Sequence, residues 1–494
     1  MFKLAPLSAA IVLALAGQVM ADNSQSTQNQ TGDENIAEVK QTAAPMSKTT
    51  QNQIGLGNNH AAVQEGGNST INQSTVGEYN AGFAEQLFEF GSQINQQSAG
   101  SLNNTHASQS LGNENQAQQT QEGSGNFSFV YQDAQTASQA TTLQYGNDNR
   151  AFAEQLNPTS VVSGINSALV IQTGTNNYAA AEHITHNSGQ VGIYQTGDDN
   201  WAYGDQREGQ GGTVAITQIG TANSTEVWQD TQADSHATVT QIGQTNESVV
   251  DQSFGDHNVT SVFQVGDLNA LYADQFEAIG SLSTLVQSGS GNVSYTYQNG
   301  ENHVLSVTSS GTGNKVLASN WKGDKAGGQF GSGQRAEINQ AGMGNSANLT
   351  QDGMTQLARL NQNGTDNTAE LTQVDRNNEL YFEQNGTDNL LIADQRGNDN
   401  YATGNSVGVA NNIKLDQSGT GNQSYTWQLY GDNNKATITQ TEGVNVAFVT
   451  QGGSGNQAMV NQSGASMTAT VQQFGGANQA TVLQQFAPRY MPPV

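Results

Sequence analysis

The chain has 494 residues, of which only 34% are hydrophobic and 56 are glycine, with no cysteine and a formal net charge of −27. So few apolar residues cannot build an ordinary globular core, which leaves either a disordered chain or a repeat structure whose interior is partly polar. The acidic balance argues against nucleic acid as the main partner. Without cysteine, stability must come from backbone pairing and packing.

The N-terminal residues 1–21 are predicted to be a secretory signal peptide. Lys3 supplies the positive charge, Leu4–Ala16 is the apolar stretch, and the segment ends in a small-residue cleavage site at Ala21. The apolar stretch is too short to span a membrane. We therefore expect an extracellular mature protein that begins with a short polar leader.

One phrase recurs through nearly all of the remaining chain. The phrase is G-x-x-N, followed by Gln six residues after the Asn, and it occurs 21 times between Gly32 and Gln484. Fifteen copies also carry Gln two residues before the Gly. Most intervals are 22 or 23 residues, and several divide into 11 plus 11 or 12. Such fixed spacing is typical of an internal repeat and not of a disordered chain.

Two long intervals interrupt the repeat. The interval of 28 residues from Gly146 to Gly174 contains Pro158, which predicts an outward loop. The interval of 31 residues from Gly311 to Gly342 predicts a loop or a break between two stacked segments. The chain is thus divided into a signal peptide (1–21), a short polar leader (22–29), a repeat solenoid (30–310) with a loop near 157–165, an interruption (311–341), a regular repeat block (342–486) and a proline-containing tail (487–494).

The residues that follow each Asn alternate in character. In the copy at Asn478, small or β-branched residues (Ala480 and Val482) and then Gln484 lie on the same side as the Asn. The opposite side takes aromatic residues in several copies. A period of two predicts a β-strand, and two strands with a glycine-containing turn make one 22-residue unit. Since neither strand can bury a face alone, we predict an all-β β-solenoid of two-strand repeats stacked as two facing parallel sheets.

Stacking places identical side chains about 4.8 Å apart. Gln and Asn amides at that spacing can hydrogen-bond up the stack, as in cross-β fibres, so a buried amide finds its partner in its own copy one turn away. The glycine suits a turn with positive φ or close backbone approach. The residues predicted to form this self-assembly ladder are Gln53, Gly55, Asn58, Gln64, Gln144, Gly146, Asn149, Gln155, Gln218, Gly220, Asn223, Gln229, Gln241, Gly243, Asn246, Gln252, Gln362, Gly364, Asn367, Gln373, Gln451, Gly453, Asn456, Gln462, Gln473, Gly475, Asn478 and Gln484.

The phrase Q-x-G-x-x-N-x-A-x-V-x-Q of Gln473–Gln484 strongly resembles the curlin repeat of curli fibre subunits, the extracellular functional amyloids of Gram-negative bacteria. The resemblance extends from Gln30 to Gln485. It implies a secreted, self-assembling structural protein that forms fimbrium-like fibres at the cell surface for biofilm and cell adhesion. It also implies a separate nucleator subunit and export through an outer-membrane secretion pore with accessory factors. This chain departs from the family in having far more repeats and a shorter leader.

Other functions remain open at this point. Within the same class, the chain is a candidate curli nucleator or surface-tethered curlin adhesin. From another class, a monomeric β-solenoid that binds ice, mineral or polysaccharide is the alternative. Thr-x-Thr triplets such as Thr238–Thr240 resemble those of ice-binding solenoids, but the outward positions mix Glu, Trp, Tyr and Thr. Outward aromatic residues suit lateral fibre packing or adhesion, or simply decorate an exposed sheet.

No pattern in the chain indicates an enzyme, a cofactor or a metal site. His183 and His186 are close enough in sequence to share a metal, but in a strand they face opposite sides and no third ligand is evident, so we expect surface histidines. Aspartate-rich turns such as Asp198–Asp199 lack the nine-residue period of calcium β-rolls, and we interpret them as solvated turn acids. A thin solenoid without a cleft is also a poor host for paired catalytic carboxylates.

Overall fold

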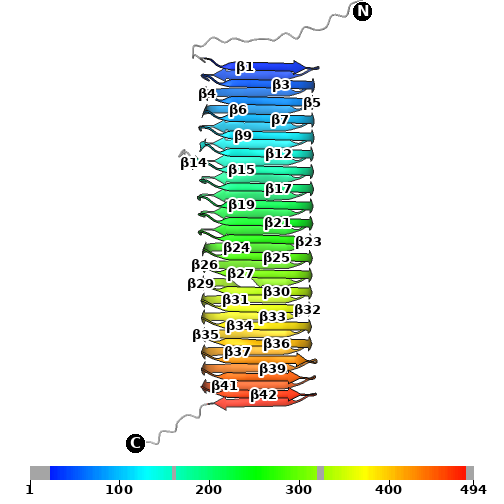
Figure 1. The fold of residues 1–494 in the computed structure, drawn as a ribbon, viewed down its shortest axis with the longest axis vertical. Coiled ribbons are helices and arrows are strands. Elements are labelled where there is room, and N and C mark those ends of the chain that lie inside the picture. Colours follow the sequence, from blue (N-terminus) through cyan, green and yellow to red (C-terminus); the bar gives the residue numbers. More distant parts are fainter. Residues whose placement is uncertain (1–22, 158–162, 320–326, 486–494) are drawn as a thin grey trace, which may run out of the picture.

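The computed structural model describes residues 23–157, 163–319 and 327–485. The predicted signal peptide and the proline-containing tail lie outside these residues. The described residues form strands that stack along one long axis, from the N-terminal to the C-terminal end (Figure 1). They include no helix long and apolar enough to cross a membrane. The predicted all-β solenoid of facing parallel sheets is confirmed.

Among the described residues, the first sheet has 20 strands and the second has 21, and β28 and β29 share one level of the second sheet. The first sheet consists of β1 (Gln25–Thr31), β3 (Lys48–Leu56), β5 (Thr70–Glu78), β7 (Gln93–Ser101), β9 (Gln116–Ser124), β12 (Gln139–Asn147), β15 (Ser167–Thr175), β17 (Gln190–Asp198), β19 (Thr213–Thr221), β21 (His236–Gln244), β23 (Val259–Asp267), β25 (Leu282–Ser290), β27 (Val304–Thr312), β30 (Arg335–Met343), β32 (Leu357–Thr365), β34 (Glu379–Thr387), β36 (Tyr401–Val409), β38 (Gln423–Tyr430), β40 (Val446–Gly452) and β42 (Thr468–Phe474).

The second sheet consists of β2 (Ile36–Thr42), β4 (Asn59–Gly67), β6 (Ala81–Phe90), β8 (Asn104–Ser110), β10 (Phe127–Asp133), β13 (Arg150–Leu156), β16 (Tyr178–Ile184), β18 (Trp201–Arg207), β20 (Ser224–Asp230), β22 (Glu247–Ser253), β24 (Ala270–Ile279), β26 (Val293–Glu301), β28 (Lys315–Ala318), β29 (Gly328–Ser332), β31 (Ser346–Met354), β33 (Thr368–Arg376), β35 (Leu390–Asn398), β37 (Asn412–Thr420), β39 (Lys435–Gly443), β41 (Gln457–Ala465) and β43 (Gln479–Gln485). A short pair, β11 (Gln135–Thr136) and β14 (Ser163–Gly164), lies beside these sheets.

The alternation in the sequence decides which side chains enter the interior. In β10, Ser128, Val130 and Gln132 are buried, whereas Phe127 and Tyr131 lie on the outer face and are half-buried. The same pattern repeats from strand to strand, so Ala, Val, Ile and Leu of the two sheets form one continuous apolar cluster along the axis. This thin core is flanked on both sides by buried amides. The solenoid therefore buries polar and apolar columns side by side.

A column of glycines forms the turn that leads from the first sheet to the second. Gly197 has φ +118°, and a Cβ on it would lie 2.0 Å from the carbonyl oxygen of Gly220 one level below. Both the backbone conformation and the close approach of the next level therefore require glycine. At the opposite turn the requirement is weaker, because Asp375 (φ 81°) and Glu442 (φ 72°) take positions that glycine occupies in neighbouring levels.

Both sheets continue through the segment 311–341. Strand β26 pairs with both β28 and β29, and each of these pairs with β31. Strands β28 and β29 are therefore two halves of one strand level, and the solenoid does not break between β26 and β31. The ladder position of this level is taken by Gln329, which aligns with Gln298 and Gln351.

Candidate functional site: the amide ladders and their two ends

The glutamines of the second sheet form a ladder along almost the whole solenoid. Each side-chain Nε2 donates to Oε1 of the glutamine in the next level, at 2.7 to 3.0 Å. The ladder passes across the insertion through Gln329. Its members are Gln41, Gln64, Gln86, Gln109, Gln132 and Gln155, followed after one interruption by Gln206, Gln229, Gln252, Gln275, Gln298, Gln329, Gln351, Gln373, Gln395, Gln417, Gln440, Gln462 and Gln484.

The first sheet carries a second glutamine ladder, which is interrupted by smaller residues. The rungs from Gln121 to Gln287 and from Gln340 to Gln384 bond in the same way. Thr75 and Ser98 replace Gln in two levels near the N-terminal end, and Ser309 and Ser406 replace it further along. The predicted ladder residues of this sheet are Gln53, Gln144, Gln218, Gln241, Gln362, Gln451 and Gln473, and each is buried and bonded to an amide of a neighbouring level.

A ladder glutamine also uses its second Nε2 hydrogen. Gln451 donates to Gln473 Oε1 at 2.9 Å and to the Lys435 carbonyl oxygen at 3.0 Å, and it accepts from Gln428 at 3.0 Å. Its side chain is 0% exposed. Because every strong donor and acceptor of the amide has a partner, burying it carries little penalty.

Most asparagines of the phrase lie in one unbroken column that runs from Asn35 to Asn478. Asn223 is representative: its backbone N and its Nδ2 both donate to Asn200 Oδ1, at 3.1 and 3.0 Å, and Nδ2 also reaches the Gly243 carbonyl oxygen at 2.9 Å. The side chain thereby ties the turn to both adjacent levels. The predicted residues Asn58, Asn149, Asn223, Asn246, Asn367, Asn456 and Asn478 all lie in this column.

The predicted glycines lie in the glycine column of the same turn. Gly55, Gly146, Gly220, Gly243, Gly364, Gly453 and Gly475 all have positive φ.

Two amide columns were not predicted from the sequence. Near the N-terminal end, Gln28, Gln51, Gln73, Gln96 and Gln119 form a third glutamine ladder, and the last four are buried where later levels have apolar residues. The signal for it was available, because each of these glutamines stands two residues before the main ladder position. A second asparagine column occupies the opposite turn in the C-terminal block and consists of Asn378, Asn400, Asn422 and Asn445.

The ladder of the second sheet is interrupted at His183, which takes the place of Gln between Gln155 and Gln206. The prediction that His183 and His186 are surface residues is wrong: they are 0% and 2% exposed. Strand β16 ends at Ile184 and Thr185 has φ 52°, so the chain turns and both rings point into the interior. Burial lowers the pKa of His183 to about 3 and that of His186 to about 4.

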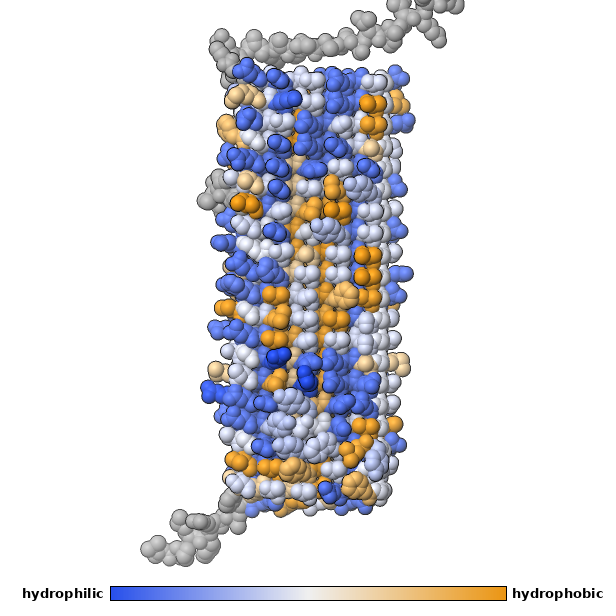
Figure 2. Space-filling model, in the orientation of Figure 1, coloured by the Kyte–Doolittle hydropathy of each residue, from blue (hydrophilic) through white to orange (hydrophobic). Residues whose placement is uncertain are grey.

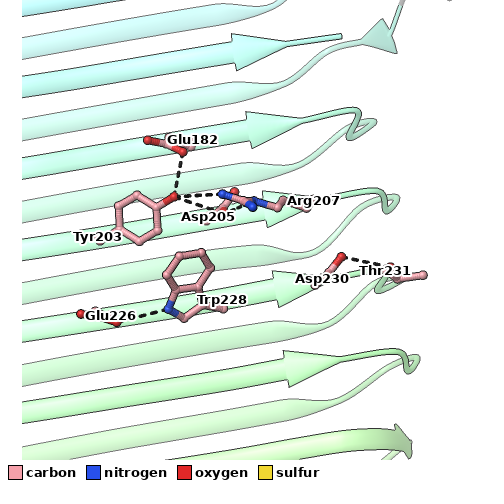
Figure 3. A network of polar contacts seen from close by, with 8 residues as sticks. All are labelled: Glu182, Tyr203, Asp205, Arg207, Glu226, Trp228, Asp230 and Thr231. Atoms are coloured by element: carbon pink, nitrogen blue, oxygen red, sulfur yellow. Dashed lines mark hydrogen bonds and ion pairs between the residues drawn. The ribbon is translucent and has the colours of Figure 1, made fainter. Parts of the chain in front are cut away.

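The outer face of the second sheet carries acidic and aromatic residues in adjacent columns. The Tyr203 hydroxyl donates to Glu182 at 2.7 Å, and Arg207 forms an ion pair with Asp205 and lies 5.4 Å from the ring centre of Trp228 (Figure 3). Burial raises the pKa of Asp205 to about 6, with a smaller contribution from Glu182. Stacking of the strands therefore brings carboxylates of successive levels close together, and few cationic side chains lie nearby to offset their negative charge.

On the face that Figure 2 shows, apolar side chains gather in short columns parallel to the long axis. Aromatic rings stack between levels, as with Phe83 and His106 at 4.8 Å and Tyr425 and Phe448 at 4.9 Å. A shallow groove on the second sheet is lined by Trp228 and Tyr272 together with Asp251. Among the described residues, no group of three or more His, Cys, Asp or Glu side chains is placed to hold a metal ion.

The comparison with known families agrees with this architecture. The model of the curlin associated repeat matches residues 342–374 and 408–441. Both matches fall in the C-terminal block, where the second-sheet glutamine ladder and the asparagine column run without a gap. These two segments of the chain are therefore curlin associated repeats. No curated protein matches it.

Proposed function

We propose that this protein is a secreted structural subunit that assembles end to end into curli-type amyloid fibres at the cell surface, where the fibres serve biofilm formation and adhesion. The role is mechanical and involves no catalytic step. The curlin repeats support the class of protein. The observation that carries the assembly step is that the ladders are incomplete at both ends of the solenoid.

At the N-terminal end, ladder acceptors have no donor. Gln30 and Gln41 donate to Gln53 and Gln64 at 2.8 Å, but no side chain in the described part of the chain donates to their own Oε1 atoms. Strand β1 is exposed along its whole length. This end therefore presents unpaired backbone groups and amide acceptors, which form a template for another strand pair.

At the C-terminal end, ladder donors have no next rung. Gln473 and Gln484 accept from Gln451 and Gln462, and their Nε2 atoms reach backbone carbonyls of their own level. Asn478 donates to Asn456, while its Oδ1 has no donor among the described residues. Donors at this end match acceptors at the other, so a second copy fits head to tail with Gln473 above Gln30 and Gln484 above Gln41. Such a heterologous contact does not close and produces a filament.

The test uses the purified mature chain. We expect slow conversion to thioflavin-positive fibres with a reflection at about 4.7–4.8 Å along the fibre axis. The double variant Gln30→Lys/Gln41→Lys places charge at the proposed contact and should reduce the elongation rate at least tenfold. The matched variant Gln97→Lys, at an exposed outward position of β7, should elongate normally.

The outcomes separate the two parts of the proposal. A chain that stays monomeric indefinitely excludes the fibre function. It then favours the monomeric polysaccharide-binding solenoid, for which the groove at Trp228 and Tyr272 is the candidate surface. Fibres that form equally fast from the double variant leave the fibre function in place but exclude the head-to-tail contact.

A further inference from the structure

The interruption of the second-sheet ladder leaves a group of buried polar atoms without partners. Neither ring nitrogen of His183 has a hydrogen bond of good geometry, and the same holds for His186 Nδ1 and Gln206 Oε1. In a regular level, Gln206 Oε1 accepts from the glutamine that His183 replaces. A buried polar group without a good partner destabilises the folded state, so four such atoms in one place need an explanation.

These atoms lie close together beside Gly189. The rings of His183 and His186 lie 6.1 Å apart between centroids. A Cβ added to Gly189 would lie 2.3 Å from Gln206 Oε1 and 2.5 Å from His186 Nδ1, so both atoms pack directly against this glycine. The Gln206 side chain and the Gly189 backbone also lie within hydrogen-bonding range of His183, where they offset part of the lowering of its pKa.

The neighbouring levels show why these side chains can approach the backbone so closely. The position of Gly189 in the turn is occupied by Ser138 and Asn166 in the two preceding levels and by Ser235 two levels further on. Gly189 and Gly212, in two successive levels, carry no side chain there. At Gly189 the His186 ring and the Gln206 side chain therefore pack against the backbone where other levels carry a side chain.

We propose that His183 and His186, with Gln206 Oε1 as a third ligand, form a buried site for a single transition-metal ion. Neutral imidazole is a ligand that zinc and copper ions favour, and metal–nitrogen bonds of about 2.0–2.1 Å hold two ring centroids about 5–6 Å apart around one ion. The ligands come from β16, the turn that follows it and β18, so the bound ion joins two levels where the amide ladder cannot. Burial keeps both imidazoles neutral and available to the ion.

The site is closed in the folded protein, so the ion has to be present during folding. The full mature chain is refolded from denaturant with Zn²⁺, or with Cu⁺ under anaerobic conditions, and unbound metal is removed by gel filtration. We expect one equivalent of retained ion, an X-ray absorption spectrum with two imidazole ligands, and a raised midpoint of thermal unfolding. The variant H183Q should lose at least nine-tenths of the retained metal and the metal-dependent shift of the midpoint.

H183Q separates metal binding from folding, because it restores the missing rung between Gln155 and Gln206 and should fold at least as well as the wild type without metal. H236Q alters an exposed histidine and serves as the matched control, which should retain the metal. Two results would overturn the proposal. One is that neither ion is retained, and the other is that H183Q retains as much ion as H236Q does.

Discussion

The side-chain amide of Gln298 donates a 2.8 Å hydrogen bond to Gln329, although 31 residues separate them. Gln329 in turn donates to Gln351 at 2.8 Å. The ladder therefore skips the inserted residues and resumes in register on the far side. The register between stacked levels is therefore kept, although the interval between these two glutamines in the sequence is longer than usual.

This relationship predicts that the insertion is dispensable. Ala318 and Gly328 occupy consecutive register positions, because Leu317 aligns with Asn348 and Gly328 with Thr350. Deleting residues 319–327 leaves Gly311 and Gly342 22 residues apart, which is the interval of a regular unit. We expect the deletion variant to fold and to resist denaturant at least as well as the wild type, since a loop closes at lower entropic cost when shortened.

Circular dichroism and the denaturation midpoint measure this outcome. A control deletion of equal length within a continuous level, residues 346–354, removes strand β31 with its rung Gln351 and should lower the midpoint clearly. If both deletions lower the midpoint equally, the inserted residues contribute to the solenoid.

The glycine column leads to a second prediction, which can be tested with two glycines of β17, Gly197 in the column and Gly192 outside it. Ala at Gly197 has to adopt φ +118° and meets the Gly220 carbonyl at 2.0 Å, so Gly197→Ala should destabilise by at least about 1–3 kcal/mol from backbone strain alone. Ala at Gly192 meets only a Tyr194 ring carbon at 3.6 Å in ordinary strand conformation. Gly192→Ala should therefore be neutral or slightly stabilising, by up to about 1 kcal/mol. Similar denaturation midpoints for the two variants would contradict the role assigned to the column.

These columns explain how far the sequence predicts the fold. At one turn of every level, the backbone geometry requires Gly, and hydrogen bonds to the adjacent levels require Asn. The G-x-x-N phrase is therefore easy to recognise in the sequence. The interior face follows from the alternation after each Asn, as in Ser128, Val130 and Gln132.

The buried histidines could not be predicted from the same rules. The prediction for His183 and His186 assumed a strand through both residues, but the positive φ of Thr185 ends the alternation. Nor does the sequence reveal that Asp205 is 1% exposed, because its burial comes from neighbours in adjacent levels that are distant in sequence. Side-chain environments on a sheet depend on three stacked levels, whereas a repeat phrase describes one.

The glutamine ladder gives a third prediction, which compares two sets of substitutions in the C-terminal block. Replacing ladder glutamines leaves buried partners unsatisfied, at about 1–3 kcal/mol for each site, whereas outward residues lose only surface contacts. The ladder set is Gln440, Gln451, Gln462 and Gln473, and the outward set is Thr437, Val444, Met459 and Thr481, each replaced together with Ala. The ladder set should slow fibre formation far more. Equal slowing would mean that composition suffices without a ladder.

The buried carboxylates make assembly dependent on pH. Burial raises the pKa of Asp274 to about 7, helped by Asp251 one level away, and burial raises the pKa of Glu89 to about 7. A carboxyl whose pKa is raised on folding binds a proton more readily in the folded state, so stability increases as the pH falls from about 7 towards the unfolded pKa near 4. We expect faster fibre formation at pH 4 to 5 than at pH 7.5, and high salt should also accelerate it.

Asp274→Asn tests the site-specific part of this effect. The variant removes the charge, so it should be more stable than the wild type at pH 7.5 and equal to it near pH 4, measured by denaturant unfolding. Glu301→Gln alters an exposed carboxylate at the end of β26 and should not change the pH profile. An identical profile for all three proteins would show that burial of Asp274 has no energetic effect.

The last prediction compares two parts of the solenoid. Residues 340–486 hold an 11-residue register with one slip, and their second-sheet ladder from Gln351 to Gln484 has no gap. A fragment of equal length centred on residues 145–290 contains both an insertion and the unsatisfied level at His183. Each rung of the first fragment can pair with its copy, so it should form fibres with a shorter lag. Introducing His183→Gln into the second fragment should shorten its lag, because the restored rung gives Gln206 Oε1 a donor. If the substitution leaves the lag unchanged, ladder continuity does not set the rate of assembly.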